Sequence, residues 1–191
     1  MRKIIVSNNV TLDGFFAGPN GELDWKVWDE EIAQYGKDQS DFTDTILFGR
    51  VTYELMSSYW PTPAASSQDP VITAFMNNSR KIVFSKTLAW ADWENSEVVN
   101  EINPKEISKM KQKQGKDMIV FGSGSVVSDL ARHGLIDDYR MFVTPVVLGR
   151  GKRLFQGIEA RMKLKLLDIK RFRNGVVLLQ YIPAEKKEAS K

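Results

Sequence analysis

The stretch IVFGSGSVVSDL, which runs from Ile119 to Leu130, decides the fold expected for this chain. Its apolar beginning is typical of a buried strand, and the residues after the glycines have the apolar spacing of a helix. The stretch ILFGRVTYE, from Ile46 to Glu54, has the same form, with an apolar strand, a glycine and then a helix. Two such junctions predict parallel strands whose carboxyl ends and following helices meet at one edge of a sheet.

The remaining elements are placed around these two junctions. Strands are expected at residues 3–8, 45–48, 80–85, 97–100, 117–121, 139–147, 163–173 and 176–182, and helices at 29–42, 51–59, 104–114 and 126–133. Pro61, Pro63 and Pro70 predict a polar loop, and Asn174-Gly175 predicts a β-hairpin. The expected fold class is therefore α/β, with a mixed, mostly parallel sheet, a C-terminal antiparallel hairpin and flanking helices.

Length and composition indicate one globular unit. The chain has 191 residues, of which 42% are apolar, so we expect a single domain over residues 1–183 and a flexible charged tail at 184–191. The first apolar run ends at Ser7, far short of a signal or membrane segment. A cysteine-free chain of this kind is expected to be cytoplasmic, with no membrane partner.

Several reaction classes are disfavoured by the residues that are missing. The sequence contains no cysteine and one histidine, His133, so thiolate chemistry and histidine metal clusters are excluded and no metal is expected. His133 stands where a helix is expected to end before Gly134. A cationic side chain at this position is explained by its favourable interaction with the last carbonyl groups of the helix. A Ser-His-Asp triad is therefore not expected.

The net charge of +3 is unevenly distributed, because residues 150–173 hold nine basic and two acidic side chains. Such a segment suits a polyanion. Met162, Leu164 and Leu166, however, alternate with lysines, which predicts a half-buried strand with a solvated outer face. No aromatic or zinc-finger nucleic-acid motif accompanies it, so no nucleic-acid partner is expected.

Both glycine junctions have the chemistry of an anion site. Gly49 permits a tight turn, and Arg50 and Thr52 bring a guanidinium and a hydroxyl to the opening of the helix. Gly122 allows a diphosphate to approach the main chain, where Ser125 and the following amides are donors. An ordinary capped helix would also explain Gly49 and Thr52, and the second junction has Val127 in place of the third glycine of a Rossmann fingerprint. Two such junctions in one small sheet nevertheless favour a dinucleotide, which has several phosphates to be bound.

Other strand ends and loops add polar and aromatic residues that are candidates for contacts with a cofactor or a substrate. Ser85 and Lys86 follow a strand and are suited to a ribose 2′-phosphate beside Arg50. Trp25 and Trp28 are candidates for stacking on a planar substrate. Asp13 is the candidate proton donor, and Asp24 is a second loop acid with the simpler interpretation of a turn cap.

These residues resemble the dihydrofolate-reductase-like superfamily, and most closely the C-terminal reductase domain of the bifunctional riboflavin-biosynthesis deaminase-reductase. The resemblance runs from about residue 2 to residue 182. It is carried by TLDGFFAGPNGELDW, ILFGRVTYE, RKIVFSK and VFGSGSVVSDLARHGLIDDYRMFVTPVVLGRGKRLF. It implies an NADPH-dependent reductase with the dihydrofolate reductase fold, acting on a small heterocyclic or carbonyl-type substrate.

The resemblance also implies roles for single residues. The implied cofactor contacts are Val6, Gly14, Gly49, Arg50, Val51, Thr52, Ser85, Lys86, Gly122, Ser123, Gly124, Ser125 and Val126, with Asp13 in the loop beside the nicotinamide. A homodimer through an edge built by residues 139–155 is expected. The sequence departs from the family at Ala33, where dihydrofolate reductase carries a carboxylate, and it lacks the deaminase half.

Three functions stay open at this level. The first is an NADPH-dependent reductase, which needs neither histidine nor cysteine because the cofactor supplies the hydride. The second is a nucleotide-binding module without turnover. The third is a polyanion binder that uses residues 150–173.

Overall fold

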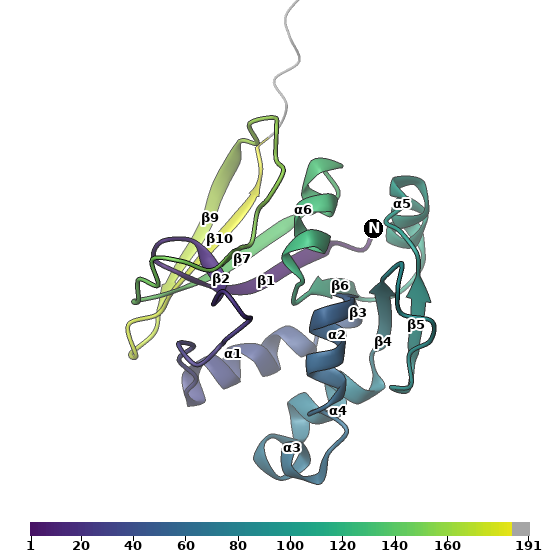
Figure 1. Cartoon of the computed structure of the whole chain (residues 1–191), viewed down its shortest axis with the longest axis horizontal. Coiled ribbons are helices and arrows are strands. Elements are labelled where there is room, and N and C mark those ends of the chain that lie inside the picture. Colours follow the sequence, from purple (N-terminus) through teal and green to yellow (C-terminus); the bar gives the residue numbers. More distant parts are fainter. Residues whose placement is uncertain (185–191) are drawn as a thin grey trace, which may run out of the picture.

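The computed structural model describes residues 1–184 of the chain (Figure 1). Its main sheet has eight strands in the order β5-β4-β3-β6-β1-β7-β10-β9. The strands are β1 (Ile4–Thr11), β3 (Thr43–Gly49), β4 (Arg80–Phe84), β5 (Ser96–Val99), β6 (Asp117–Val120), β7 (Asp138–Thr144), β9 (Leu164–Arg171) and β10 (Val177–Pro183). Along this order, the strands β5, β4, β3, β6, β1 and β7 are parallel to one another. β10 pairs antiparallel with both β7 and β9. The expected mixed sheet with a C-terminal antiparallel hairpin is confirmed.

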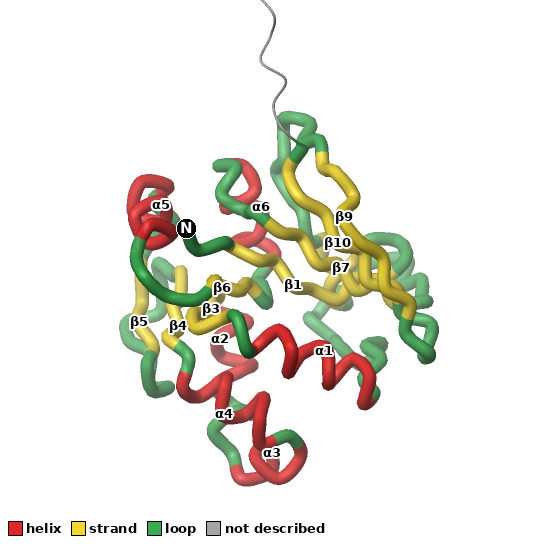
Figure 2. The backbone as a smooth tube through the Cα atoms, turned by 180° about the vertical axis from the view of Figure 1, so that it is seen from behind, coloured by secondary structure: helices red, strands yellow, loops and turns green. Residues whose placement is uncertain are grey.

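Helices cover both faces of this sheet. They are α1 (Glu30–Ser40), α2 (Arg50–Ser57), α3 (Pro63–Gln68), α4 (Pro70–Asn78), α5 (Pro104–Gln112) and α6 (Gly124–Arg132). Figure 2 shows α1 and α4 on the same side of the sheet, with α3 beyond them. Two short strands, β2 (Phe15–Ala17) and β8 (Lys152–Arg153), form a separate antiparallel pair.

The alternation of side chains along the central strands divides the core between the two faces. Ile4 and Leu47 pack with Ile107 of α5 and Leu130 of α6 on one face. On the other face, Ile46, Phe48 and Ile119 pack with residues of α2 and α4, and Ile32 of α1 packs with Phe142 and Leu178. Because the central strands are buried on both faces, their sequences are continuous apolar runs.

The prediction of a polar loop around Pro61, Pro63 and Pro70 is wrong, because this region forms α3 and α4. Pro63 and Pro70 each stand at the first position of a helix, where a missing N–H costs nothing. The residues before them, Thr62 and Asp69, cap those helices by accepting from Ala65 N and Ile72 N. The sequence therefore carried two helix-start signals that resemble loop breakers.

The strand predicted at 163–173 is present as β9, but it is exposed and not half-buried as predicted. Every residue of β9 is exposed, with Leu164, Leu166, Leu167 and Ile169 between 38% and 54% exposed. β9 is the last strand of the sheet, and α1 reaches it at Lys170, whose ammonium group lies 5.6 Å from the ring centroid of Tyr35. Alternation of apolar and charged residues marks a strand with one apolar face, but it does not say whether the same chain covers that face.

The first part of the dimer-forming edge expected at 139–155 is not an edge of the sheet, and the dimer itself stays a prediction. β7 lies inside the sheet between β1 and β10, so its main chain is already paired on both sides.

The expected hairpin at Asn174-Gly175 is present and connects β9 to β10. Of the predicted tail, residues 185–191 lie outside the described residues. Within residues 1–184, no helix is long and apolar enough to cross a membrane.

Candidate functional site

The two glycine junctions lie in contact at the carboxyl ends of β3 and β6. The amide of Gly49 donates to the carbonyl oxygen of Gly122 at 3.2 Å. A Cβ atom at Gly49 would overlap the hydroxyl of Ser123, so only glycine allows this approach. The structure therefore brings together the start of α2 and the start of α6 at one edge of the sheet.

Neither of these helix N-termini is closed by a side chain within the described residues. Gly49 has no side chain to offer, and Ser123 makes no capping hydrogen bond because its hydroxyl pairs with Ser125 Oγ at 2.8 Å. The first turn of a helix leaves N–H groups without helical partners and carries a partial positive charge. Two open N-termini side by side thus form one surface suited to an anion.

Small residues bring the main chain to this surface. Gly122 has φ +123°, and a Cβ there would lie 3.1 Å from Thr52 Oγ1. A Cβ at Gly124 would lie 2.9 Å from a ring carbon of Phe16 and 3.0 Å from the carbonyl oxygen of Arg153. Larger side chains at either position would displace the turn, which explains the glycines in the sequence.

Arg50 and Lys86 are exposed beside this surface, whereas Ser85 is buried in a turn. Gly49 pairs with Phe84 across β3 and β4, so the residues that follow these strands are neighbours. The Arg50 guanidinium forms an exposed ion pair with Glu54 at 2.8 Å. The Ser85 hydroxyl accepts from Thr87 N at 3.1 Å and Leu88 N at 2.9 Å, so it holds its own turn.

Of the three valines predicted at the cofactor, only one is accessible. Val51, in the first turn of α2, is 57% exposed. Val6 has no exposed surface and Val126 is 3% exposed, because both side chains pack in the core beneath α6. These two side chains therefore contribute core packing beneath the anion-binding surface.

Asp13 ties the loop after β1 to the segment after β7. Its carboxylate accepts from the Thr11 hydroxyl and from Gly149 N at 2.8 Å, and these bonds hold its pKa below the usual range. The adjacent Gly14 has φ +85°, as this turn requires. The observed contacts of Asp13 are those of a loop anchor, and its catalytic role stays a prediction.

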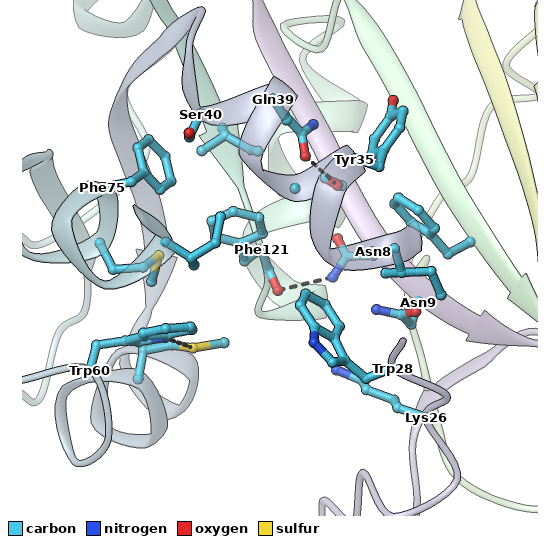
Figure 3. A pocket seen from close by; sticks show the side chains of 18 residues that line it. Asn8, Asn9, Lys26, Trp28, Tyr35, Gln39, Ser40, Trp60, Phe75 and Phe121 are labelled. Carbon is cyan, nitrogen blue, oxygen red and sulfur yellow. Dashed lines mark hydrogen bonds between the residues drawn. The ribbon is translucent and has the colours of Figure 1, made fainter. Parts of the chain in front are cut away.

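A cavity of about 250 Å³ opens next to the glycine junctions, on the face covered by α1 and α4 (Figure 3). Aromatic side chains supply much of its lining: Trp28, Tyr35, Trp60, Phe75, Phe121 and Phe142. Phe121 immediately precedes Gly122, and its carbonyl oxygen accepts from Asn8 Nδ2 at 2.9 Å. The cavity and the anion-binding surface therefore share the Phe121–Gly122 segment.

Two buried side chains of the cavity lining have polar atoms without partners in the described part of the chain. Asn8 is 7% exposed and its Oδ1 accepts no hydrogen bond, whereas Gln39 is 5% exposed and its Nε2 donates none. Gln39 Oε1 accepts instead from the Ser7 hydroxyl at 3.3 Å. Buried groups of this kind cost free energy unless a ligand or water pairs with them.

Lys26 is the one lysine or arginine in the lining of this cavity as described. Burial lowers the pKa of its ammonium group to about 8. Asp and Glu are absent from the described lining, and Ala33, which stands where dihydrofolate reductase carries a carboxylate, lines a different groove. Residues 1–184 contain no group of three or more His, Asp or Glu side chains placed to hold a metal ion.

Of the two tryptophans predicted to bind substrate, Trp28 lines the cavity and is 59% exposed. Trp25 does not line it, and its indole N–H donates to the carbonyl oxygen of Glu22 at 3.2 Å. Sequence reasoning missed Asn8, Gln39 and Lys26. A signal existed for Asn8, because the polar pair Asn8-Asn9 follows an apolar run at the carboxyl end of a strand, where ligands bind.

The fold and this edge of the sheet define the class of the protein, which is a dihydrofolate-reductase-like α/β protein. The family model described as "RibD C-terminal domain" matches residues 2–178. The chain therefore belongs to the RibD C-terminal domain family. The resemblance stated from the sequence is confirmed.

Two curated relatives come from Bacillus subtilis (strain 168). The uncharacterized protein YyaP is 34% identical over 180 residues, covering 94% of each chain. The uncharacterized protein YwjB is 31% identical over 186 residues, covering 96% of this chain and 99% of its own. Both relatives therefore share nearly the whole length of the chain.

Solved structures with the same fold have more distant sequences. A putative riboflavin biosynthesis protein from Shewanella sp. PV-4 has a TM-score of 0.73 at 19% identity, covering 96% of this chain and 99% of its own. The deaminase/5-amino-6-(5-phosphoribosylamino)uracil reductase of Thermotoga maritima has a TM-score of 0.67 at 17% identity, and the match covers 96% of this chain and 57% of that one. A pyrimidine reductase-like protein from Corynebacterium diphtheriae has a TM-score of 0.67 at 14% identity, covering 97% and 93%.

Proposed function

We propose that this protein is an NADPH-dependent reductase that transfers a hydride to a small planar substrate. The observation that carries the proposal is the pair of open helix N-termini, joined by the hydrogen bond from Gly49 N to Gly122 O at 3.2 Å, directly beside an aromatic cavity. A dinucleotide needs an anion-binding surface for its phosphates and an adjacent apolar cavity for its reactive ring. Membership of a reductase-type family supports the same function.

The residues present fit NADPH. First-turn amides of α2 and α6 would bind phosphate oxygens, and the glycines at 49, 122 and 124 keep side chains out of the way. Arg50 and Lys86, both exposed beside the start of α2, would select the cofactor that carries a 2′-phosphate. Ser85 would contribute by shaping this turn, because its hydroxyl is already engaged.

NADPH supplies the hydride when bound, so the protein has to orient the substrate and keep bulk water away. The aromatic walls around Trp60, Phe75 and Phe121 would enclose a flat ring. Because the described lining holds no carboxylate and the Asp13 carboxylate has a lowered pKa, we propose that the proton comes from water.

A titration followed by nicotinamide fluorescence tests this function. We expect NADPH to bind, to bind more tightly than NADH, and to be consumed with a substrate from a panel of pterins, pyrimidines and small carbonyl compounds. A protein that binds NADPH but consumes it with no compound of the panel would be a nucleotide-binding module. A protein that ignores NADPH and binds DNA with a steep salt dependence would be a polyanion binder.

The homodimer expected from the resemblance is a separate proposal, which we now assign to β9. Its exposed leucine and isoleucine side chains form an apolar surface on an edge strand, the kind of surface that a second copy covers. The double variant Leu166→Lys/Ile169→Lys should sediment as a monomer. Val71→Lys, an equally exposed position on α4, is the control and should leave the dimer intact. A monomeric unmodified protein would refute the proposal.

A further inference from the structure

The lining of the cavity contains a cation without a counter-ion in the described part of the chain. Figure 3 shows the Lys26 side chain beside Trp28, among the residues that line this space. Burial alone lowers the pKa of the Lys26 ammonium group to about 8, with no contribution from a neighbouring charge or hydrogen bond. Asn8 Oδ1 and Gln39 Nε2 are enclosed by protein, whereas Lys26 Nζ keeps accessible surface. Lys26 is therefore a partly desolvated positive charge that a ligand in the cavity can reach.

Carboxylates close to Lys26 in the chain do not neutralise it. Glu22 accepts two hydrogen bonds from Asn20, at 2.9 and 2.7 Å. Asp29 caps α1, and Asp24 is exposed and does not line the cavity. The described lining holds no Asp or Glu side chain, so the matching negative charge has to come from a ligand.

The surroundings of the cavity limit how much negative charge that ligand can carry. A groove that shares Trp28 and Trp60 with the cavity is lined by three carboxylates and a single lysine, which itself lies 3.4 Å from Asp69. The helix that begins beside this groove, α1, has its N-terminus capped by Asp29. Proteins bind phosphate dianions with arginine forks, several cations or open helix N-termini. One ammonium group beside an acidic groove matches a single negative charge instead.

We propose that the substrate of the cavity is a compact aromatic carboxylate, whose carboxylate oxygen accepts a hydrogen bond from the Lys26 ammonium group. The ring would lie between the aromatic walls around Trp60, Phe75 and Phe121. The proposal rests on the proposed reductase function, because it treats this cavity as the substrate site. A charge-assisted hydrogen bond in a partly desolvated place is stronger than one in water, so it would both hold the ligand and orient its ring.

Three ligands with one ring system test the charge that the cavity selects: 2-naphthoate, the neutral 2-naphthamide and the dianionic 2-naphthyl phosphate. They are titrated with and without NADP⁺, and binding is followed by the indole N–H resonances of Trp28 and Trp60, which line the cavity. We expect 2-naphthoate to shift both resonances and to bind at least about tenfold more tightly than 2-naphthamide. Trp90, which is 69% exposed and outside the described lining, is the internal control. Equal binding of the amide, tighter binding of the phosphate, or no binding of 2-naphthoate in either condition overturns the proposal.

A variant identifies the group responsible. Lys26→Met keeps an unbranched side chain and removes the charge, so it should abolish the preference for 2-naphthoate and leave the affinity for 2-naphthamide unchanged. Because an unpaired, partly buried charge is lost, Tm should stay the same or rise. Lys37→Met is the matched control, since Lys37 lines the neighbouring groove and is paired with Asp69. A preference that survives Lys26→Met, or that is lost equally in Lys37→Met, overturns the assignment.

The NADP⁺ arm separates Lys26 from the second place in the protein where a carboxylate would bind, the open N-termini of α2 and α6. A preference for 2-naphthoate that NADP⁺ removes and Lys26→Met does not change would place the carboxylate at those N-termini, against the proposal. Consumption of NADPH is not involved in any titration, so a failed reductase proposal is recognised separately.

Discussion

Helices begin in two different ways in this molecule. At α1, α3, α4 and α5 a side chain closes the N-terminus: Asp29, Thr62, Asp69 and Asn103 each accept a hydrogen bond from the first turn. At α2 and α6 no side-chain cap is found within residues 1–184, and these two N-termini lie against each other.

The difference separates helices that serve only the fold from helices proposed to bind an anion. A side-chain cap stabilises a helix by about 1 kcal/mol relative to alanine and by roughly a few tenths of that relative to glycine, so the uncapped starts of α2 and α6 cost little in folding and leave first-turn N–H groups without a side-chain acceptor. The cost is expected to be recovered when a phosphate takes the place of the missing cap. Mutations that close the open N-termini, or open a closed one, test this comparison directly.

The largest effect is expected for Gly49→Ala. The new methyl group would overlap the Ser123 hydroxyl and press on the start of α6, so the free energy of unfolding should fall by about 1–3 kcal/mol. NADPH binding, measured by nicotinamide fluorescence, should be lost because the two N-termini are forced apart. The double variant Gly49→Ala/Ser123→Gly removes the obstructing side chain and should restore part of both properties. Absence of any rescue would contradict this explanation.

The next effect is expected for Ser125→Asp, which places a carboxylate in the exposed first turn of α6. The helix should gain about 0.5 kcal/mol from its dipole, while NADPH binding should weaken about a hundredfold through repulsion of the phosphates. Ala64→Asp puts the same charge at the equivalent position of α3, a capped helix. It should leave the dissociation constant for NADPH unchanged, and a similar loss in both variants would mean that overall charge is responsible.

A smaller and more selective effect is expected for Arg50→Ala. Loss of one charge-assisted contact should weaken NADPH about tenfold and leave NADH nearly unaffected, because only NADPH carries the 2′-phosphate. Arg132→Ala is the matched control, since Arg132 is equally exposed and also forms a 2.8 Å ion pair within its helix. Equal losses for the two nucleotides would rule out a 2′-phosphate contact at Arg50.

The sequence predicted the edge of the sheet better than the cavity, for a physical reason. A strand, a glycine and a helix are adjacent in sequence, so the junctions at Gly49 and Gly122 are visible as local patterns. The cavity is lined by residues of β1, α1, α2, α4, β6 and β7, so it depends on contacts between segments that are far apart in the chain. α4 itself was missed because Pro70 resembles a loop breaker.

Single polar residues were the hardest part of the site to find. Gln39 lies seven residues after Ile32 on α1, and its helical spacing indicates a buried face, but nothing local says that its amide nitrogen has no partner. Ser85 shows the opposite case, because a hydroxyl suited to a phosphate is used by its own turn. Whether a polar group is free depends on the packing of the whole chain.

The smallest effect is expected where a closed N-terminus is opened. Asn103→Ala removes the acceptor for Lys105 N at the start of α5, and the free energy of unfolding should fall by about 1 kcal/mol. NADPH affinity should not change, because α5 follows the edge strand β5, which β4 separates from β3, so its N-terminus is not part of the joined N-termini of α2 and α6. Chemical denaturation and the fluorescence titration measure the two quantities on the same sample. If uncapping α5 altered NADPH affinity as much as Arg50→Ala, then the state of a helix N-terminus would no longer distinguish structural helices from binding helices in this protein.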